Sequence, residues 1–336
     1  MSLRLIEIFS PSDLAGNILS VLAEQPTHGT WQDQLPDENS LLRVLVSSEH
    51  TETICDLLEG RFAGREGFRL MLLPVEATIP RIEAPEPEQA PPVAEPPKSK
   101  GRRISREELY DDIAETARLS TVYFVMVVLS AVVAAIGLLR GSVAILIGAM
   151  VIAPLLGPNV ALALATTLAD FALARRAIGI TVSGIAVALV CAVAMGLVIP
   201  VDPSMSELAS RTEIGYGDVI LALASGVAGA LAFTTGVPSA LIGVMVAVAL
   251  VPPLVTAGLM MGSGHWQPAG GAALLLACNI VCINLAGVVT FIAQGIRPRT
   301  WCEAEKAKRA TWLAIGLWVV LLIVLIVLIA LSRAGG

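Results

Sequence analysis

The chain has 336 residues, of which 55% are hydrophobic and 15% charged, with a net charge of -6 and a mean hydropathy of +0.77. So large an apolar share excludes an ordinary soluble globular protein, and the acidic balance gives no reason to expect nucleic acid as a partner. The five cysteines are scattered, so they predict neither a disulfide framework nor a metal site. We expect no cofactor.

Residues 1–78 predict a small α+β ferredoxin-like domain. Strand-like and helix-like stretches follow the order β-α-β-β-α-β, the split unit of that fold. They cover 3–9, 12–24, 27–34, 41–47, 52–61 and 68–75, and the second strand has the least apolar alternation. The start of the chain lacks the apolar core and cleavage site of a signal peptide. We therefore expect this domain in the cytoplasm.

Residues 79–104 predict a proline-rich linker, because repeated prolines favour an extended polyproline II chain over packed structure. Residues 105–120 then predict an amphipathic helix. Ser105 and Glu108 form the capping pattern of a helix start. Leu109, Ile113 and Ala117 lie along one face of this helix, and acidic residues occupy the others.

Seven apolar stretches predict transmembrane helices, because each is long enough to cross about 30 Å of hydrocarbon. They cover 121–139, 142–168, 177–199, 219–233, 239–261, 272–292 and 312–331. Positive side chains gather in the loops of one side, which predicts that this side faces the cytoplasm: Arg175, Arg176, Arg297, Arg299, Lys306, Lys308 and Arg309. We expect the bacterial inner (plasma) membrane, with the amino terminus in the cytoplasm and the carboxyl terminus outside.

The chain matches itself at an offset of 95 residues. Residues 130–158 and 225–253 are identical at 11 of 29 positions without a gap, including Pro158 with Pro253. Transmembrane repeat 1 then covers 121–200, transmembrane repeat 2 covers 216–293, and a seventh transmembrane helix at 311–332 is unrepeated. Because each repeat has three helices, the second enters from the other side, which predicts a 3+3 inverted repeat. Small residues such as Gly148 predict close helix packing.

The middle span of each half carries helix breakers. Pro154, Gly157 and Pro158 lie in the first, and Pro252 and Pro253 lie in the second. A proline removes a backbone donor, so both helices are expected to break and to present polar backbone inside the bilayer.

Two broken helices predict a site for a small solute or ion between them. The candidate substrate-binding residues are Pro154, Gly157, Pro158, Asn159, Pro252, Pro253, Thr256, Asn279 and Asn284. An alternative is that the prolines only bend the helices and that the asparagines bond neighbouring helices. Charged side chains between 121 and 292 fall in or next to loops, so carboxylate-based proton coupling is not expected.

The phrases IGLLRGSVAILIGAMVIAPLLGP and SREELYDDIAETARLS resemble those of a broad prokaryotic family of hydrophobic membrane proteins, the domain of unknown function 389 family. The resemblance covers residues 105–292 and is most specific in the run from Gly148 to Pro158. It implies a membrane fold and brings no established activity.

The leading hypothesis is a membrane transporter or channel for a small solute or ion, with its site between the two broken helices. The alternative is a membrane-embedded assembly or signalling protein with a regulatory cytoplasmic domain. An enzyme is not expected, because no side chains stand at catalytic spacing. The expected partners are the lipid bilayer, the solute and further copies of the chain in a homo-oligomer.

Overall fold

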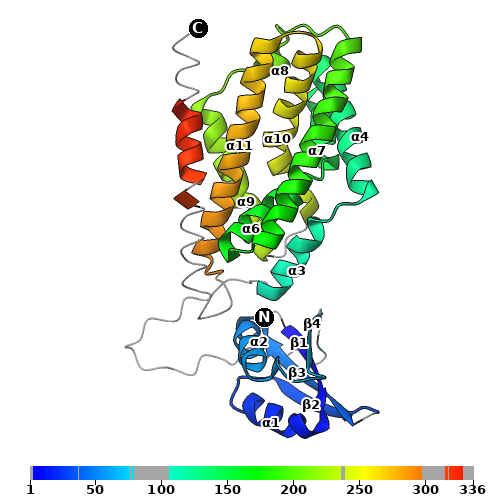
Figure 1. The fold of residues 1–336 in the computed structure, drawn as a ribbon, viewed down its shortest axis with the longest axis vertical. Coiled ribbons are helices and arrows are strands. Elements are labelled where there is room, and N and C mark those ends of the chain that lie inside the picture. Colours follow the sequence, from blue (N-terminus) through cyan, green and yellow to red (C-terminus); the bar gives the residue numbers. More distant parts are fainter. Residues whose placement is uncertain are drawn as a thin grey trace. The chain divides into compact units, whose positions relative to one another are not determined.

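The computed structural model describes residues 3–36, 38–75, 78, 106–235, 239–296, 315–316 and 318–327. The chain is mainly helical and forms two compact units, Met1–Leu109 and Tyr110–Gly336 (Figure 1). The predicted linker over 79–104 and both ends of the predicted seventh helix lie outside the described residues.

The first unit has the predicted order of elements. β1 (Leu3–Pro11), α1 (Ser12–Leu22), β2 (Gly29–Gln34), β3 (Asn39–Ser47), α2 (Ser48–Phe62) and β4 (Arg69–Val75) follow one another. The strands form one antiparallel sheet in the order β2-β3-β1-β4. The β-α-β-β-α-β prediction is therefore confirmed. β2 forms although its sequence hardly alternates, because β3 supplies a partner for every one of its residues.

One face of this sheet carries the core of the first unit. Successive residues of a strand point to opposite faces, and the side chains of Ile6, Ile8, Leu42 and Val44 are fully buried in one cluster with Ile18 of α1 and residues of α2. Burying such a side chain stabilises a fold by roughly 1.5–3 kcal/mol. The alternation in β1 thus indicates which face the two helices cover.

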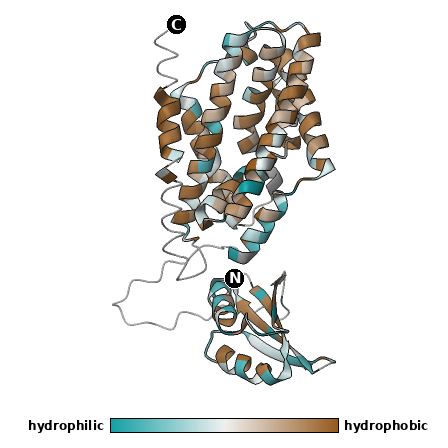
Figure 2. Ribbon diagram, viewed as in Figure 1, coloured by the Kyte–Doolittle hydropathy of each residue, from teal (hydrophilic) through white to brown (hydrophobic). Residues whose placement is uncertain are grey.

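The second unit is a bundle of apolar helices, coloured mostly brown in Figure 2. After α3 (Arg106–Thr116) come α4 (Thr121–Leu139), α5 (Val143–Ile152), α6 (Leu156–Leu168), α7 (Phe171–Val198), α8 (Ser206–Ala209), α9 (Tyr216–Thr235), α10 (Ser239–Gly262) and α11 (Trp266–Ala293). Leu109, Ile113 and Ala117, which share the apolar face of the predicted amphipathic helix, are buried.

Four described helices, α4, α7, α9 and α11, are each long and apolar enough to cross a membrane. The bent pair of α5 and α6 makes a fifth if it counts as one span. The segments Val246–Gly262 and Trp318–Val327 are apolar but shorter over the part that the structure describes. These helices suggest a membrane location, and the total of seven spans stays a prediction.

The outer surface of the bundle is apolar. On α7 the side chains of Val182, Val190 and Leu197 are 59%, 69% and 72% exposed. Exposed aliphatic side chains along a long helix are what a lipid-facing surface requires, because hydrocarbon does not penalise them.

α10 packs against α7, and α6 packs against α11. A Cβ added at Gly258 of α10 would collide with Ala192 of α7, and one at Gly287 of α11 would lie 2.9 Å from the Cβ of Ala163 on α6. The two contacts correspond at the offset of 95 residues. Gly148 has open space around it, with nothing within 4 Å. Within the part of the chain that the structure describes, no neighbouring helix contacts Gly148, so its packing role stays a prediction.

α7 connects the two ends of the bundle. It begins directly after the turn that follows α6, and near its other end Val193 and Gly196 lie against Gly262, the last residue of α10. Its 28 residues span about 40 Å. The α6–α7 turn and the α10–α11 turn therefore lie at opposite ends of α7 (Figure 1).

These two turns have the same backbone conformation. Ala169 has a φ of 56° and Gly264 a φ of 83°, so both are left-handed. In each turn the next residue donates its N–H to the carbonyl five residues earlier: Asp170 to Ala165 at 2.9 Å, and His265 to Met260 at 2.8 Å. All three pairs of positions correspond at the offset of 95 residues.

Candidate functional site

The first predicted break is confirmed. α5 ends at Ile152 and α6 begins at Leu156, with a bend of 54° between them. Pro154 lies in the break, and Pro158 occupies the first turn of α6. A proline is tolerated there because the first N–H groups of a helix have no partner within it. Two prolines one turn apart thus end one helix and start the next.

The second predicted break is wrong. α10 runs without interruption from Ser239 to Gly262, with Pro252 and Pro253 inside it. Pro253 cannot donate to the carbonyl of Ala249, four residues earlier. The side-chain nitrogen Nδ2 of Asn279, on α11, donates to that oxygen at 2.6 Å instead. A site between two broken helices is therefore not present, because a neighbouring helix replaces the missing donor.

The two proline segments nevertheless meet. Ala153, Pro154 and Leu155 line one side of a cavity of about 10 Å³, and Val251 and Val255 of α10 line another. This volume holds about one water molecule. The lining is apolar apart from Ser130, whose hydroxyl already donates to the carbonyl of Ala149 at 2.9 Å. The cavity is therefore unsuited to a polar solute.

Two buried asparagines join α6 to α11. Asn284 Nδ2 donates to Asn159 Oδ1 at 3.2 Å and to the carbonyl of Ile280 at 2.9 Å. Asn159 Nδ2 in turn donates to the carbonyl of Leu155, at the break, at 2.8 Å. Asn159 is 1% exposed and Asn284 is fully buried. This chain of bonds connects the break between α5 and α6 with α11.

Three buried polar atoms near these segments have no hydrogen-bond partner among the described residues: Asn279 Oδ1, Asn284 Oδ1 and Thr256 Oγ1. Two of them are amide oxygens, which only accept hydrogen bonds. Leaving such an acceptor buried and unpaired costs about 1–3 kcal/mol. The two oxygens are thus suited to a ligand that carries a positive charge or a donor group.

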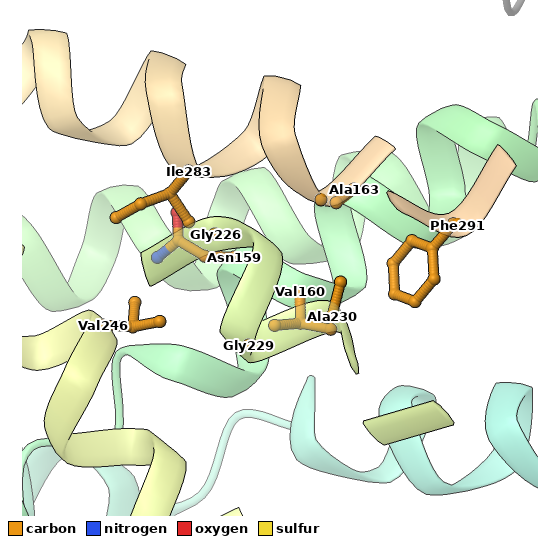
Figure 3. A pocket seen from close by; sticks show the side chains of 10 residues that line it. Asn159, Val160, Ala163, Gly226, Gly229, Ala230, Val246, Ile283 and Phe291 are labelled. Carbon is orange, nitrogen blue, oxygen red and sulfur yellow. The ribbon is translucent and has the colours of Figure 1, made fainter. Parts of the chain in front are cut away.

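Asn159 also borders a narrow gap between α6 and the helices α9, α10 and α11 (Figure 3). The opposite wall contains Gly226 and Gly229 of α9, and Ile283 and Phe291 of α11 close the sides. In this conformation the gap has no room for a water molecule. The gap lies between residues of the first predicted repeat, on α6, and residues of the second, on α9, α10 and α11.

The nine candidate residues thus fall into different places. Asn159 and Asn284 come together, and Asn279 bonds the backbone beside Pro253. Gly157 has a packing role, because a Cβ added to it would lie 2.6 Å from the Cβ of Thr116. Ser130, which lines the cavity, was not among the candidate residues. In the sequence it is marked only by its match with Ser225 at the offset of 95 residues.

Comparisons with known proteins identify relatives. The family described as "Domain of unknown function (DUF389)" matches residues 150–285, a range that holds Asn159, Asn279 and Asn284. The chain is 34% identical to "Uncharacterized protein MJ0678" of Methanocaldococcus jannaschii, in an alignment that covers 98% of this chain and 99% of that protein. No solved structure matches the chain.

Proposed function

Since the chain belongs to the domain of unknown function 389 family, whose description names no activity, we propose a function from the chain's own residues. The protein is a membrane transporter or channel for a small solute or ion, built as seven spans in a 3+3 inverted repeat plus one. The observation that carries this proposal is the buried pair of Asn159 and Asn284, which joins the two repeats and leaves an acceptor oxygen unpaired.

Matching contacts support the inverted repeat. The contact of Gly258 with Ala192 corresponds, at the offset of 95 residues, to the contact of Ala163 with Gly287. The α6–α7 and α10–α11 turns have the same backbone hydrogen bond and lie at opposite ends of α7. A pseudo-two-fold axis in the membrane plane generates both relations. Transporters of this plan rock one repeat against the other around a site at their interface, which is where the asparagine pair lies.

The chemistry of the pair favours a class of solute. α6 and α11 contain no Asp, Glu, Lys or Arg, so the pair carries no formal charge and has no charged neighbour on its own helices. The unpaired oxygens of Asn279 and Asn284 attract a cation or a hydrogen-bond donor. A divalent ion would stay uncompensated among neutral groups. We therefore expect a monovalent cation or a small neutral solute with N–H or O–H groups.

The proposed path is closed in this conformation. The gap beside Asn159 excludes water, and several of its walls are small residues, namely Ala163, Gly226, Gly229, Ala230 and Gly287. Small side chains allow helices to slide past one another without large steric barriers. We expect a shift of α6 against α9 and α11 to open the gap and to expose the asparagine pair.

Flux into lipid vesicles that contain the purified full-length protein tests the proposal. The probes are radioactive sodium, radioactive rubidium and a neutral polyol, with sulfate for comparison. We expect uptake of a monovalent cation or of the polyol above that of empty vesicles, and none of sulfate. Asn284→Leu should lower this uptake by about tenfold or more, a cost of about 1.4 kcal/mol.

Thr290→Val is the matched control. Thr290 lies on the same helix, is 8% exposed and donates only to the carbonyl of Ala286 at 2.7 Å. Its loss should leave uptake within about twofold of the parent. Equal uptake by protein-containing and empty vesicles for every probe, or full uptake by the Asn284→Leu protein, would contradict the proposal.

A second function, assembly or signalling through the first unit, is favoured by one observation. Trp31, Met71 and Leu73 are large apolar side chains that stay 52%, 38% and 40% exposed on its sheet. If this is the main function, the vesicles show no flux, and deletion of residues 1–100 has the same effect in cells as deletion of the whole chain.

A further inference from the structure

The sheet of the first unit has a second face, opposite the one that carries the core. Strand register places Glu7, Arg43, Trp31 and Met71 in one row across the four strands of this face. We call it the open face. Trp31, Met71 and Leu73 on this face are exposed, as given above, whereas Leu41 and Leu45 of the central strand β3 are only 6% and 8% exposed.

We propose that two copies of this chain pack through their open faces, around a two-fold axis that runs parallel to the strands between β3 and β1. A two-fold axis is the usual symmetry of a homodimer and requires a self-complementary surface. Rotation about this axis places β2 of one copy over β4 of the other, and β3 over β1.

The charges on the open face are complementary under this rotation. In the row described above, Arg43 comes to lie over Glu7 of the second copy. In the next row the register aligns Asp33, Leu41, Phe9 and Arg69. There Asp33 faces Arg69 of the second copy. Each acidic side chain thus meets a basic one across the interface.

The apolar positions are complementary as well. Leu41 lies over Phe9 of the second copy. In a third row, where the register aligns Gly29, Leu45, Leu5 and Leu73, Leu45 lies over Leu5. Because Leu41 and Leu45 are 6% and 8% exposed in one copy, they form the apolar floor of the face on either side of the charged row.

The other two-fold axis within the plane of the interface is disfavoured. An axis perpendicular to the strands places each strand over its own copy, and where it passes through the row of Arg43 and Glu7 it opposes Arg43 to Arg43 and Glu7 to Glu7. Like charges opposed across an interface cost several kcal/mol. The axis parallel to the strands instead opposes unlike charges in both rows.

The local shape of the face also suits sheet packing, which brings two sheets about 10 Å apart. The ring of Trp31 lies over Gly29, where an added Cβ would be 2.7 Å from a ring carbon. Because glycine has no side chain at this point, the indole lies along the sheet. A flat indole leaves room for the second copy, whereas an upright one would hold the sheets apart.

The size of the face predicts modest affinity. Residues of one face are about 6.8 Å apart along a strand and strands are about 4.8 Å apart, so three to four rows on four strands offer about 500 Å² per copy. The total of about 1,000 Å² is at the low end for a specific interface. Copies held in one membrane meet at high effective concentration, which makes a small interface sufficient.

Cross-linking in vesicles that contain the full chain tests the geometry. Asp33→Cys and Arg69→Cys proteins are prepared separately and mixed, and a short bifunctional maleimide is added. Within one copy the two positions are three strand spacings apart, about 14 Å. We expect a cross-linked dimer in the mixture at least about fivefold more abundant than in either protein alone or in the parent chain.

Charge reversal tests the complementarity independently. Asp33→Arg places arginine opposite Arg69, and Arg69→Asp places aspartate opposite Asp33. Each protein alone should associate about tenfold more weakly than the parent, as read by energy transfer between fluorescent proteins fused at the amino terminus. A mixture of the two restores opposite charges at both contacts, so association should recover in mixed dimers.

The two variants serve as controls for each other. Asp33 also accepts a hydrogen bond from Arg43 of its own copy at 2.6 Å, so its reversal removes a contact within the fold. Arg69→Asp changes no hydrogen bond or ion pair that the structure describes. Thermal unfolding should be unchanged for Arg69→Asp. Undiminished association of either variant, or no recovery on mixing, would overturn the proposal.

Discussion

Asn279 Nδ2 donates a hydrogen bond of 2.6 Å to the carbonyl oxygen of Ala249. Ala249 precedes Pro253 by four residues, so this oxygen is the one that Pro253 leaves without its helical donor. α11 therefore supplies a donor that α10 lacks. α10 is a single helix across two consecutive prolines, and this bond satisfies the carbonyl that Pro253 leaves without a donor.

Asn279→Leu should destabilise the protein by about 1–3 kcal/mol, because the Ala249 oxygen is left buried and unpaired. In a Pro253→Ala background the same substitution should cost at least about 1 kcal/mol less, because alanine in place of the proline restores the backbone N–H. Chemical unfolding in detergent of the four proteins of this cycle measures the difference. An equal cost in both backgrounds would show that the bond does not compensate for the proline.

Substitution of the left-handed residue should have opposite effects in the α6–α7 turn, where it is Ala169, and in the α10–α11 turn, where it is Gly264. Ala169→Gly should raise stability by about 1 kcal/mol, because an L-residue in the left-handed region costs roughly 1–2 kcal/mol. Gly264→Ala should lower stability by a similar amount. Thermal unfolding in detergent measures both. Shifts of the same sign for the two substitutions would contradict the equivalence of the turns.

The close helix contacts at Gly258 and Gly287 predict that an added methyl group at either position lowers stability. Gly258→Ala and Gly287→Ala should each destabilise by about 1–3 kcal/mol, because an added Cβ meets Ala192 or Ala163. Gly179→Ala on α7 is the control, since nothing lies within 4 Å of a Cβ there. Alanine favours a helix over glycine by about 1 kcal/mol, so the control should be neutral or stabilising in the same unfolding assay.

Tyr110 predicts a loss of stability at high pH. Its hydroxyl donates to Asp170 Oδ2 at 2.7 Å, and this hydrogen bond raises the pKa of Tyr110. A raised pKa in the folded state means that the contribution is complete below the ordinary pKa of about 10 and is lost as the pH rises through the folded-state value. Raising the pH from about 8 to about 11 should therefore lower the stability of the parent more than that of Tyr110→Phe, as measured by unfolding. Parallel pH profiles would exclude this linkage.

Local patterns in the sequence determined the elements. The predicted range 121–139 coincides with α4 (Thr121–Leu139), and the predicted succession of strands and helices in the first unit matches the structure. These predictions succeed because a long apolar run or a period of two depends on neighbours within a few residues. The weak alternation of 27–34 still gave β2, because pairing with β3 outweighed local preference.

Tertiary structure decided which prolines break a helix and which glycines allow contact. Pro154 and Pro253 have the same local effect, the loss of one backbone donor. Their outcomes differ because Asn279 reaches the carbonyl of Ala249 from another helix. Likewise Gly258 lies against α7, whereas no described residue lies within 4 Å of a Cβ added at Gly148. Hydrogen-bond satisfaction and helix contact depend on groups brought together from distant parts of the chain, and no local pattern contains them.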